Sequence, residues 1–334
     1  MASELAGTVL VTWIDYDVDA AGQGGALRDA GLGLRMDPRL RDRTPAELVR
    51  LLDGAVAAIV STDPFTREVL ESAPRLRVIA RVGVGTDSID LPAATELGVA
   101  VTTTPGANNE TVADHTLAIM LAAVRRVVEH DAGVRNGSWK RAGDMTPWEL
   151  HGKTVGLVGY GSIGRAVAKR LDGFDVRVLI TDPLAPPGTD PRYVELDELL
   201  RSSDVVSLHV PLTAQTAGLL DAERLAEMRT DAILVNTSRG GIVDEEALAN
   251  SLERRRLRAA ALDVFEHEPP NGERLRALPN VVLTPHLGGL SDSSIAEMTR
   301  RATASVLSVL GGGSDGVINP EALTRSERVM ETGT

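Results

Sequence analysis

Short apolar runs alternate with helical patterns over the first hundred residues. The segment 44–54 is typical of a helix, with Thr44 as the N-cap, Pro45 in the first turn and Glu47 as the acid of a capping box. The apolar runs are continuous, as in strands that are covered on both faces, and they lie at 8–14, 55–61, 75–82 and 98–105. Strands that alternate with helices predict a parallel α/β sheet.

From residue 110 the hydrophobic period becomes that of one long helix. The stretch ETVADHTLAIMLAAVRRVVEH, residues 110–130, predicts about six turns, or roughly 30 Å at ~1.5 Å per residue. Such a helix is long enough to bridge two domains. The stretch after it, 136–153, is irregular and holds Trp139 and Trp148, so we expect a connecting loop that packs on another surface, such as a second subunit.

A second α/β series follows. Its expected strands lie at 154–159, 175–182, 204–210, 231–238, 258–264 and 280–286. Helical segments lie between most of them, and residues 291–310 predict a long final helix with Ser291 as its cap. A chain of 334 residues is too long for one compact core, so two domains are expected.

Composition and charge narrow the function classes. The net charge of −12 argues against nucleic acid or an anionic membrane as the main partner, because both attract basic surfaces. The chain has no cysteine, which excludes disulfides, thiolate metal sites and cysteine nucleophiles. No metal ligand set is predicted. Neither a signal-peptide pattern nor an apolar run of membrane-spanning length is present, so we expect a cytoplasmic protein.

The stretch TVGLVGYGSIGRAVAKRL predicts a dinucleotide site. Gly159 permits a tight turn, Gly161 lets the backbone approach a pyrophosphate, and Gly164 allows the helix to pack closely on the strand. The helix N-terminus then offers free N–H groups to the phosphates. Asp182 ends the next strand, where a carboxylate accepts hydrogen bonds from the ribose hydroxyls and repels a 2′-phosphate. NAD is therefore favoured over NADP.

Catalytic groups are expected where the other strands of this sheet end, because ligands bind there in open α/β folds. His286 ends a strand, follows Pro285 and precedes two glycines, and an imidazole titrates near neutral pH, so it suits general acid and base work. Arg239 can bind a carboxylate through two hydrogen bonds. Asp263 ends its own strand. His115 and His130 are interpreted as structural or solvated helix residues, and His267 as a solvated loop residue.

Several stretches, taken together, resemble one known family. VGLVGYGSIG, NTSRGGIVDEEAL, ALDVFEHEP and LTPHLGG, in this order and spacing, are similar to the D-isomer-specific 2-hydroxyacid dehydrogenases, in their phosphoglycerate dehydrogenase-like form without the C-terminal regulatory domain. The resemblance covers nearly the whole chain. It implies two Rossmann-like α/β domains with parallel sheets: a discontinuous substrate domain at 1–104 and 288–334, an NAD-binding domain at 105–287, and a homodimer.

The resemblance also implies site residues. The catalytic set falls on Arg239, Glu268 and His286. The substrate-binding residues fall on Arg81, Val82, Gly83, Val84 and Asn108, together with Arg239 and His286. Besides the three loop glycines and Asp182, the nucleotide-binding residues fall on Ser162, Ile163, Pro183, His209, Val210, Pro211, Thr216, Thr237, Ser238, Asp263 and Gly288.

The implied reaction is an NAD-dependent interconversion of a 2-ketoacid and its D-2-hydroxyacid. His286 gives a proton to the 2-keto oxygen during reduction and removes it during oxidation, Glu268 stabilises the imidazolium, and Arg239 binds the carboxylate. Val60 and Ser61 stand where phosphoglycerate members carry a basic residue, which disfavours 3-phosphoglycerate; the substrate stays open. The alternative is an NAD-sensing, corepressor-like binding protein of the same fold.

Overall fold

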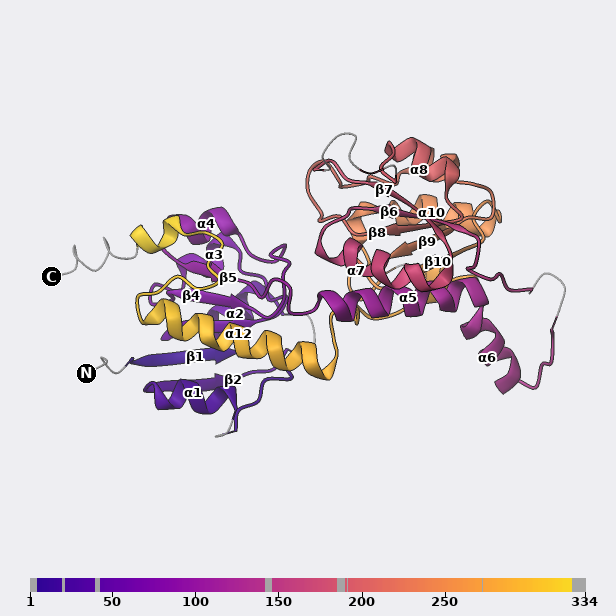
Figure 1. Ribbon diagram of the computed structural model, residues 1–334. Coiled ribbons are helices and arrows are strands. Elements are labelled where there is room, and N and C mark those ends of the chain that lie inside the picture. The colour runs from indigo at the N-terminus through magenta and orange to yellow at the C-terminus, as the bar shows by residue number, and fades with distance from the viewer. Residues whose placement is uncertain are drawn as a thin grey trace. The chain divides into compact units, whose positions relative to one another are not determined.

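A computed structural model describes residues 5–19, 22–39, 43–141, 146–184, 190, 192–271 and 273–325. The chain divides into two compact units, Met1–Asn108 with Ser291–Thr334, and Asn109–Leu290 (Figure 1). The breaks fall after residues 108 and 290, where the predicted domain limits are 104 and 287. Each unit is an α/β fold with a parallel sheet, which confirms the predicted fold class.

The first unit has a five-stranded sheet of order β2-β1-β3-β4-β5, in which every neighbouring pair is parallel. Its strands are β1 (Gly7–Val11), β2 (Leu32–Met36), β3 (Ala55–Val60), β4 (Val78–Arg81) and β5 (Ala100–Thr102). The inner strands carry buried residues on both faces, and all six residues of β3 are buried. This explains why the inner strands appear in the sequence as continuous apolar runs.

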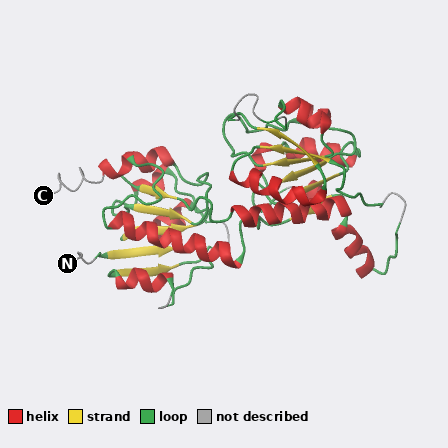
Figure 2. Ribbon diagram, in the orientation of Figure 1, coloured by secondary structure: helices red, strands yellow, loops and turns green. Residues whose placement is uncertain are grey.

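Helices cover both faces of this sheet (Figure 2). On one face pack α1 (Gln23–Asp29) and the final helix α12 (Asp292–Leu310). On the other pack α2 (Pro45–Leu51), α3 (Arg67–Glu71) and α4 (Leu91–Glu96). The predicted caps are confirmed: Thr44 and Glu47 form a capping box, and the Ser291 hydroxyl caps α12.

The second unit has a six-stranded parallel sheet of order β11-β10-β9-β8-β6-β7. Its strands are β6 (Thr154–Val158), β7 (Arg177–Thr181), β8 (Val205–Leu208), β9 (Ile233–Asn236), β10 (Ala259–Leu262) and β11 (Val281–Leu283). A parallel bridge between Ile180 and Tyr193 adds a short strand position beyond β7. From β6 the chain first adds β7 on one side of the sheet and then β8 on the other, so the direction of strand addition reverses at β6. In such folds a nucleotide binds at this point, beyond the carboxyl ends of the strands.

Two helical layers enclose this second sheet. One layer holds α5 (Asn109–Arg125) and α7 (Ser162–Leu171), with the short helix η1 (Asp172–Phe174) after α7. The other holds α8 (Leu196–Ser202), α9 (Ala222–Glu227), α10 (Glu245–Glu253) and α11 (Glu273–Ala277). The 3-10 turn η2 (Gly240–Ile242) follows β9, and α6 (Val127–Arg135) follows α5.

The prediction of one helix over 110–130 is wrong. Arg126 adopts a left-handed conformation, with φ 53° and ψ 38°, and separates α5 from α6. The Val124 carbonyl at the end of α5 accepts a hydrogen bond of 3.0 Å from the Trp148 N–H, and the Arg126 guanidinium pairs with Glu129 at 2.6 Å. A residue of the loop beyond α6 therefore binds the last turn of α5. This contact cannot be predicted from the spacing of apolar residues within 110–130. Trp148 packs within this unit, where Lys153 and Arg258 both make cation–π contacts with its ring.

Sequence reasoning missed β2. Of its five residues only Leu32 is buried, because the strand lies at the edge of its sheet. It therefore lacks the apolar run by which the inner strands are recognised. Among the helices in the described ranges, none is both long enough and apolar enough to cross a membrane.

Candidate active site

The glycine loop between β6 and α7 has the geometry of a phosphate cradle. Gly159 has a φ of +98°, and a Cβ there would lie 2.7 Å from the His209 carbonyl oxygen. A Cβ on Gly164 would lie 2.3 Å from the Gly159 carbonyl oxygen, so both glycines are required by the chain itself. Gly161 differs, since a Cβ there would meet no atom within 4 Å. The absence of a side chain at Gly161 leaves room for a ligand to approach the backbone.

The start of α7 completes this cradle. Gly161 is the N-cap and provides no side-chain hydrogen bond, so the first N–H groups of the helix have no side-chain cap. Ser162, the first helical residue, is exposed, and Ile163 is half-buried against the core. The geometry of the loop and the partial positive charge of the helix end fit the pyrophosphate of a dinucleotide.

Asp182 is held beside this loop. Its Oδ2 accepts a hydrogen bond of 2.7 Å from the Tyr160 N–H, and its Oδ1 accepts one of 2.8 Å from the Leu184 N–H. Two backbone donors thus fix an anionic group at the end of β7, next to the exposed Pro183. The nearby Arg192 guanidinium donates to Asp190 at 2.6 Å and to the Tyr160 hydroxyl at 3.2 Å, so its charge is paired with the Asp190 carboxylate.

His209 follows β8, the strand that pairs with β6. Burial lowers its pKa to about 4, so the imidazole is neutral at pH 7. Its Nε2 lies 3.0 Å from the Ser207 hydroxyl. The neutral, mostly buried ring suits a lining of the nucleotide site better than proton transfer. Val210 beyond it is also buried.

The remaining predicted nucleotide contacts end neighbouring strands. The Thr216 hydroxyl donates to the Pro211 carbonyl at 2.5 Å and closes the turn after β8. Thr237 is buried, with its hydroxyl 2.8 Å from that of Thr116 on α5. The Ser238 hydroxyl donates to Asn236 Oδ1 at 3.0 Å. These contacts order the loops after β8 and β9.

His286 and Glu268 form a direct pair. His286 Nδ1 lies 2.7 Å from Glu268 Oε2, although eighteen residues separate them in the chain. The Phe265 N–H donates to Glu268 Oε1 at 3.1 Å and orients the carboxylate. The side chains are 41% and 37% exposed, so both remain accessible to a small molecule. His267 and Glu266 are exposed, and the Glu266 N–H donates to Glu245 at 2.6 Å.

Arg239 lies at the end of β9, on the loop next to the one that carries Glu268. Its Nη1 donates to the Ser238 carbonyl at 2.7 Å, and its own carbonyl accepts from Asn236 Nδ2 at 2.8 Å. A Cβ on the following Gly240 would lie 1.9 Å from the Phe265 carbonyl carbon. The loops after β9 and β10 therefore touch through their backbones. Since β9, β10 and β11 are neighbours, Arg239, Glu268 and His286 all lie at one edge of one sheet.

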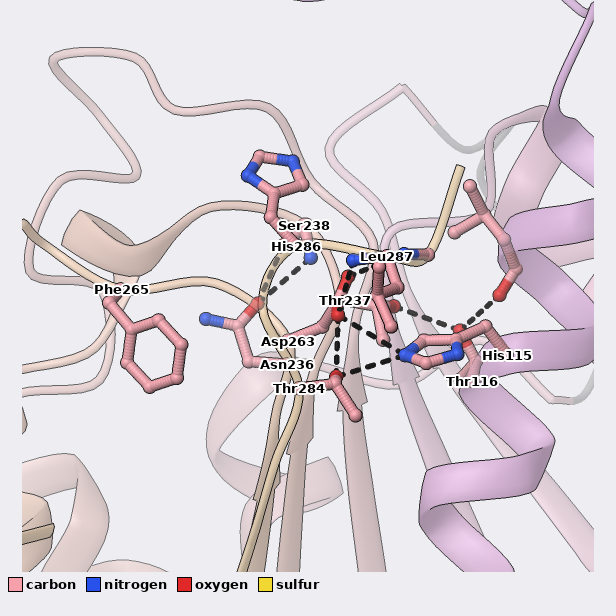
Figure 3. Close-up of polar contacts among 12 residues, drawn as sticks. His115, Thr116, Asn236, Thr237, Ser238, Asp263, Phe265, Thr284, His286 and Leu287 are labelled. Carbon is pink, nitrogen blue, oxygen red and sulfur yellow. Dashed lines mark hydrogen bonds and ion pairs between the residues drawn. The ribbon is translucent and has the colours of Figure 1, made fainter. Parts of the chain in front are cut away.

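Asp263 at the end of β10 is 1% exposed and is held by its own chain (Figure 3). Its Oδ1 accepts from the Thr284 hydroxyl at 2.5 Å, and its Oδ2 from the Gly288 N–H at 2.8 Å. Burial acts to raise its pKa, but hydrogen bonds from His115, Thr284 and the backbone outweigh burial and lower the pKa. A Cβ on Gly288 would lie 2.9 Å from Asp263 Oδ2, so the glycine permits this approach.

The predicted substrate residues Arg81 to Val84 and Asn108 belong to the first unit. After β4, the Gly83 N–H donates to the Thr104 hydroxyl at 3.0 Å, and Gly83 has a φ of +135°. Arg81 donates to the Val82 carbonyl and folds across the loop. Val84 is 49% exposed. The buried Asn108 Oδ1 has no hydrogen-bond partner among the residues that the structure describes.

Sequence reasoning missed the part that His115 plays. Its Nε2 lies 3.0 Å from the Thr284 hydroxyl and 3.2 Å from Asp263 Oδ1. No pattern in the stretch 110–130 distinguishes this histidine from His130, because the partners of His115 lie about 150 to 170 residues away. In the part of the chain that is described, no group of three or more histidine or acidic side chains could hold a metal ion.

Comparison with known proteins finds similar sequences and solved structures. Residues 117–288 match the family model described as the D-isomer specific 2-hydroxyacid dehydrogenase, NAD binding domain. A glyoxylate reductase of Korarchaeum cryptofilum is 43% identical over 274 residues, which are 80% of this chain and 82% of the relative. The crystal structure of the TT0316 protein from Thermus thermophilus is 43% identical with a TM-score of 0.86, over 93% of this chain and 99% of the other.

A second solved structure was determined with ligands bound. D-lactate dehydrogenase from Aquifex aeolicus, complexed with NAD and lactic acid, is 30% identical with a TM-score of 0.80. The match covers 91% of this chain and 96% of that one.

Proposed function

The chain belongs to the D-isomer-specific 2-hydroxyacid dehydrogenase family, and we propose that Arg239, Glu268 and His286 are the side chains with which it performs the family's reaction. The protein is an NAD-dependent oxidoreductase that interconverts a 2-ketoacid and its D-2-hydroxyacid. The named relatives are reductases and dehydrogenases, and none of them supports the corepressor-like alternative. The observation that carries the catalytic proposal is the 2.7 Å pair between His286 and Glu268.

His286 is the general acid and base of this proposal. Its Nδ1 faces Glu268, which leaves Nε2 as the nitrogen that meets the substrate. During reduction Nε2 gives its proton to the 2-keto oxygen, and during oxidation it takes a proton from the 2-hydroxyl group. The Glu268 carboxylate fixes the ring orientation and stabilises the imidazolium. Bound NADH supplies the hydride that C2 receives.

Arg239 binds the substrate carboxylate and stabilises negative charge on the 2-keto oxygen as it develops. The nucleotide contacts of the proposal are Gly159, Gly161, Ser162, Ile163, Gly164, Asp182, Pro183, His209, Val210, Pro211, Thr216, Thr237, Ser238, Asp263 and Gly288. The substrate-binding residues that we predict in the first unit are Arg81 to Val84 and Asn108. The open backbone at Gly161 and the two-donor fixation of Asp182 support the NAD part of this assignment.

We propose a short 2-ketoacid such as glyoxylate or hydroxypyruvate as the substrate. Three relatives at 39 to 43% identity are named glyoxylate reductase, and one at 41% is named hydroxypyruvate reductase. Val60 and Ser61 also offer no charge for a second anionic group.

The test is NADH oxidation with glyoxylate, hydroxypyruvate, pyruvate, 2-oxoglutarate and a phosphorylated ketoacid. The highest kcat/KM is expected for one of the first two. A preference for the phosphorylated acid would overturn the substrate proposal. In the same assay, His286→Asn is expected to lower kcat by about 10³-fold or more while NADH still binds. Wild-type kcat in that variant would refute the catalytic assignment.

We further propose that the protein is a homodimer. The helix α6 exposes Val127, Val128 and Val134, each more than half exposed, and Trp139 after it is 77% exposed. Exposed apolar side chains that gather on one segment are typical of an interface. Sedimentation equilibrium is expected to give twice the chain mass, and Val128→Glu with Val134→Glu is expected to give the monomer. A wild-type monomer would contradict this proposal.

A further inference from the structure

The backbone of His286 adopts a conformation that needs support. Its φ is +55°, in the left-handed region that side chains other than glycine rarely occupy. Such a residue keeps its conformation only where the surrounding contacts hold it there. The conformation matters because it sets the direction in which the imidazole leaves the chain.

Asp263 provides this support by accepting hydrogen bonds from three consecutive backbone N–H groups. The His286 N–H donates to the Asp263 carbonyl at 2.8 Å. The Leu287 N–H donates to its Oδ1 and the Gly288 N–H to its Oδ2, both at 2.8 Å. The carboxylate and the carbonyl of one residue thus bind the turn that carries His286, and any rotation of the Asp263 side chain would release two of the three bonds.

The orientation of the Asp263 carboxylate depends in turn on His115. Since the Thr284 hydroxyl donates to Asp263 Oδ1 at 2.5 Å, its oxygen offers His115 a lone pair. Asp263 Oδ1, 3.2 Å from His115 Nε2, is an acceptor as well. Both neighbours of this nitrogen therefore accept, so His115 Nε2 carries a hydrogen and donates it to them.

His115 is not itself directed at the catalytic pair. In Figure 3 its ring points from α5 toward Asp263 and Thr284, whereas the imidazole of His286 points away from them. The ring is 18% exposed, and its contacts join α5 to the ends of β10 and β11. The polar contacts through which His115 can act on the turn of His286 are therefore those with Asp263 and Thr284.

We propose that His115 is a positioning residue of the active site: its Nε2–H holds the Asp263 carboxylate, which holds the backbone of residues 286–288 and thereby aims the imidazole of His286. The inference rests on the proposed function, because it assumes that His286 transfers the proton. It assigns to a helix histidine a part in catalysis that its sequence context does not indicate.

The test compares His115→Leu, which has no donor, with His115→Gln, whose amide N–H can replace Nε2–H. His115→Leu is expected to lower kcat for ketoacid reduction by about 10- to 100-fold, because displacing a catalytic group by about 1 Å costs on the order of 10²-fold. His115→Gln is expected to restore most of this loss. Hydrogen exchange of a peptide that contains residues 284–289 is expected to be faster in the leucine variant alone. His151→Leu, at a 72% exposed histidine of the same unit, is the matched control and should keep the wild-type kcat.

The outcomes separate this inference from the proposed function. Wild-type kcat in His115→Leu overturns the inference. Equal losses of kcat in the leucine and glutamine variants, without faster exchange at 284–289, reduce His115 to a structural residue and also overturn it. If His115→Leu does not fold, Thr284→Val removes the hydroxyl between His115 and Asp263 and must lower kcat in its place. Activity retained by His286→Asn would instead refute the proposed function itself.

Discussion

Replacing Gly240 by alanine is expected to separate the two loops that carry Arg239 and Glu268. The added Cβ would lie 1.9 Å from the Phe265 carbonyl carbon, 2.1 Å from its oxygen and 2.3 Å from the Glu266 nitrogen. The optimal separation of two non-bonded carbon atoms is about 3.5 to 4.0 Å. Since all three neighbours are backbone atoms, no side-chain rotation relieves the overlap, and one loop must move by about 1.5 Å.

A displacement of this size has two measurable costs. Overpacking of a buried site costs about 1 to 3 kcal/mol of stability. Misplacing a catalytic group by about 1 Å costs on the order of 10²-fold in rate, or about 2.7 kcal/mol of transition-state stabilisation. Gly240→Ala is therefore expected to lower kcat/KM for the ketoacid by about 10²-fold and to lower the unfolding temperature. NADH should still bind, because the glycine loop after β6 is unchanged.

The neighbouring Gly241 provides the control. A Cβ there would lie 3.5 Å from a methyl carbon of Leu212, which is an ordinary contact. Gly241→Ala should thus keep wild-type kcat/KM and stability, although the chemical change is identical and one residue away. Steady-state kinetics and thermal unfolding of both variants measure these effects. Equal behaviour of the two, or wild-type kinetics in Gly240→Ala, would refute the reasoning.

Three further predictions concern single side chains. Asp182→Ser removes the charge that repels a 2′-phosphate, so the ratio of kcat/KM for NADPH to that for NADH should rise by about tenfold or more; an unchanged ratio would count against Asp182 as the ribose contact. Glu268→Gln removes the carboxylate charge that faces His286 Nδ1, so kcat for ketoacid reduction should fall by about tenfold or more, and a wild-type kcat would argue against the pair. His209 has a pKa of about 4 in the fold, below the ordinary histidine value, so an unfolded chain takes up its proton first as the pH falls. Protonation of this group does not reduce the free energy of unfolding above about pH 6.5, and it lowers that free energy by roughly 3 kcal/mol toward pH 4. In urea unfolding over that pH range, His209→Gln should therefore lose less stability than the wild type, and an equal loss would contradict the prediction.

Much of the second unit could be predicted because its signals are local. The strand, the three glycines, the helix and Asp182 follow one another within about thirty residues, as in other dinucleotide-binding units. Gly159 and Gly164 are required by the turn that they form. The three loops with Arg239, Glu268 and His286 each follow a strand of one parallel sheet, and parallel strands place their carboxyl ends at one edge. The distance between His286 and Glu268 is known only from the folded structure. The same is true of the solvent exposure of His267.

By itself the sequence determined the α/β class, the glycine loop between β6 and α7, and the sheet edge at which Arg239, Glu268 and His286 lie, because the apolar period, the glycines and the strand ends are features of a few neighbouring residues. Tertiary structure alone decided where the helix of 110–130 breaks, since Val124 is capped by Trp148 from a distant loop. It also decided that His115 contacts Asp263 and Thr284. Such pairings depend on which strand ends and helix faces the folded chain brings together, and the spacing of residues along the chain does not specify them.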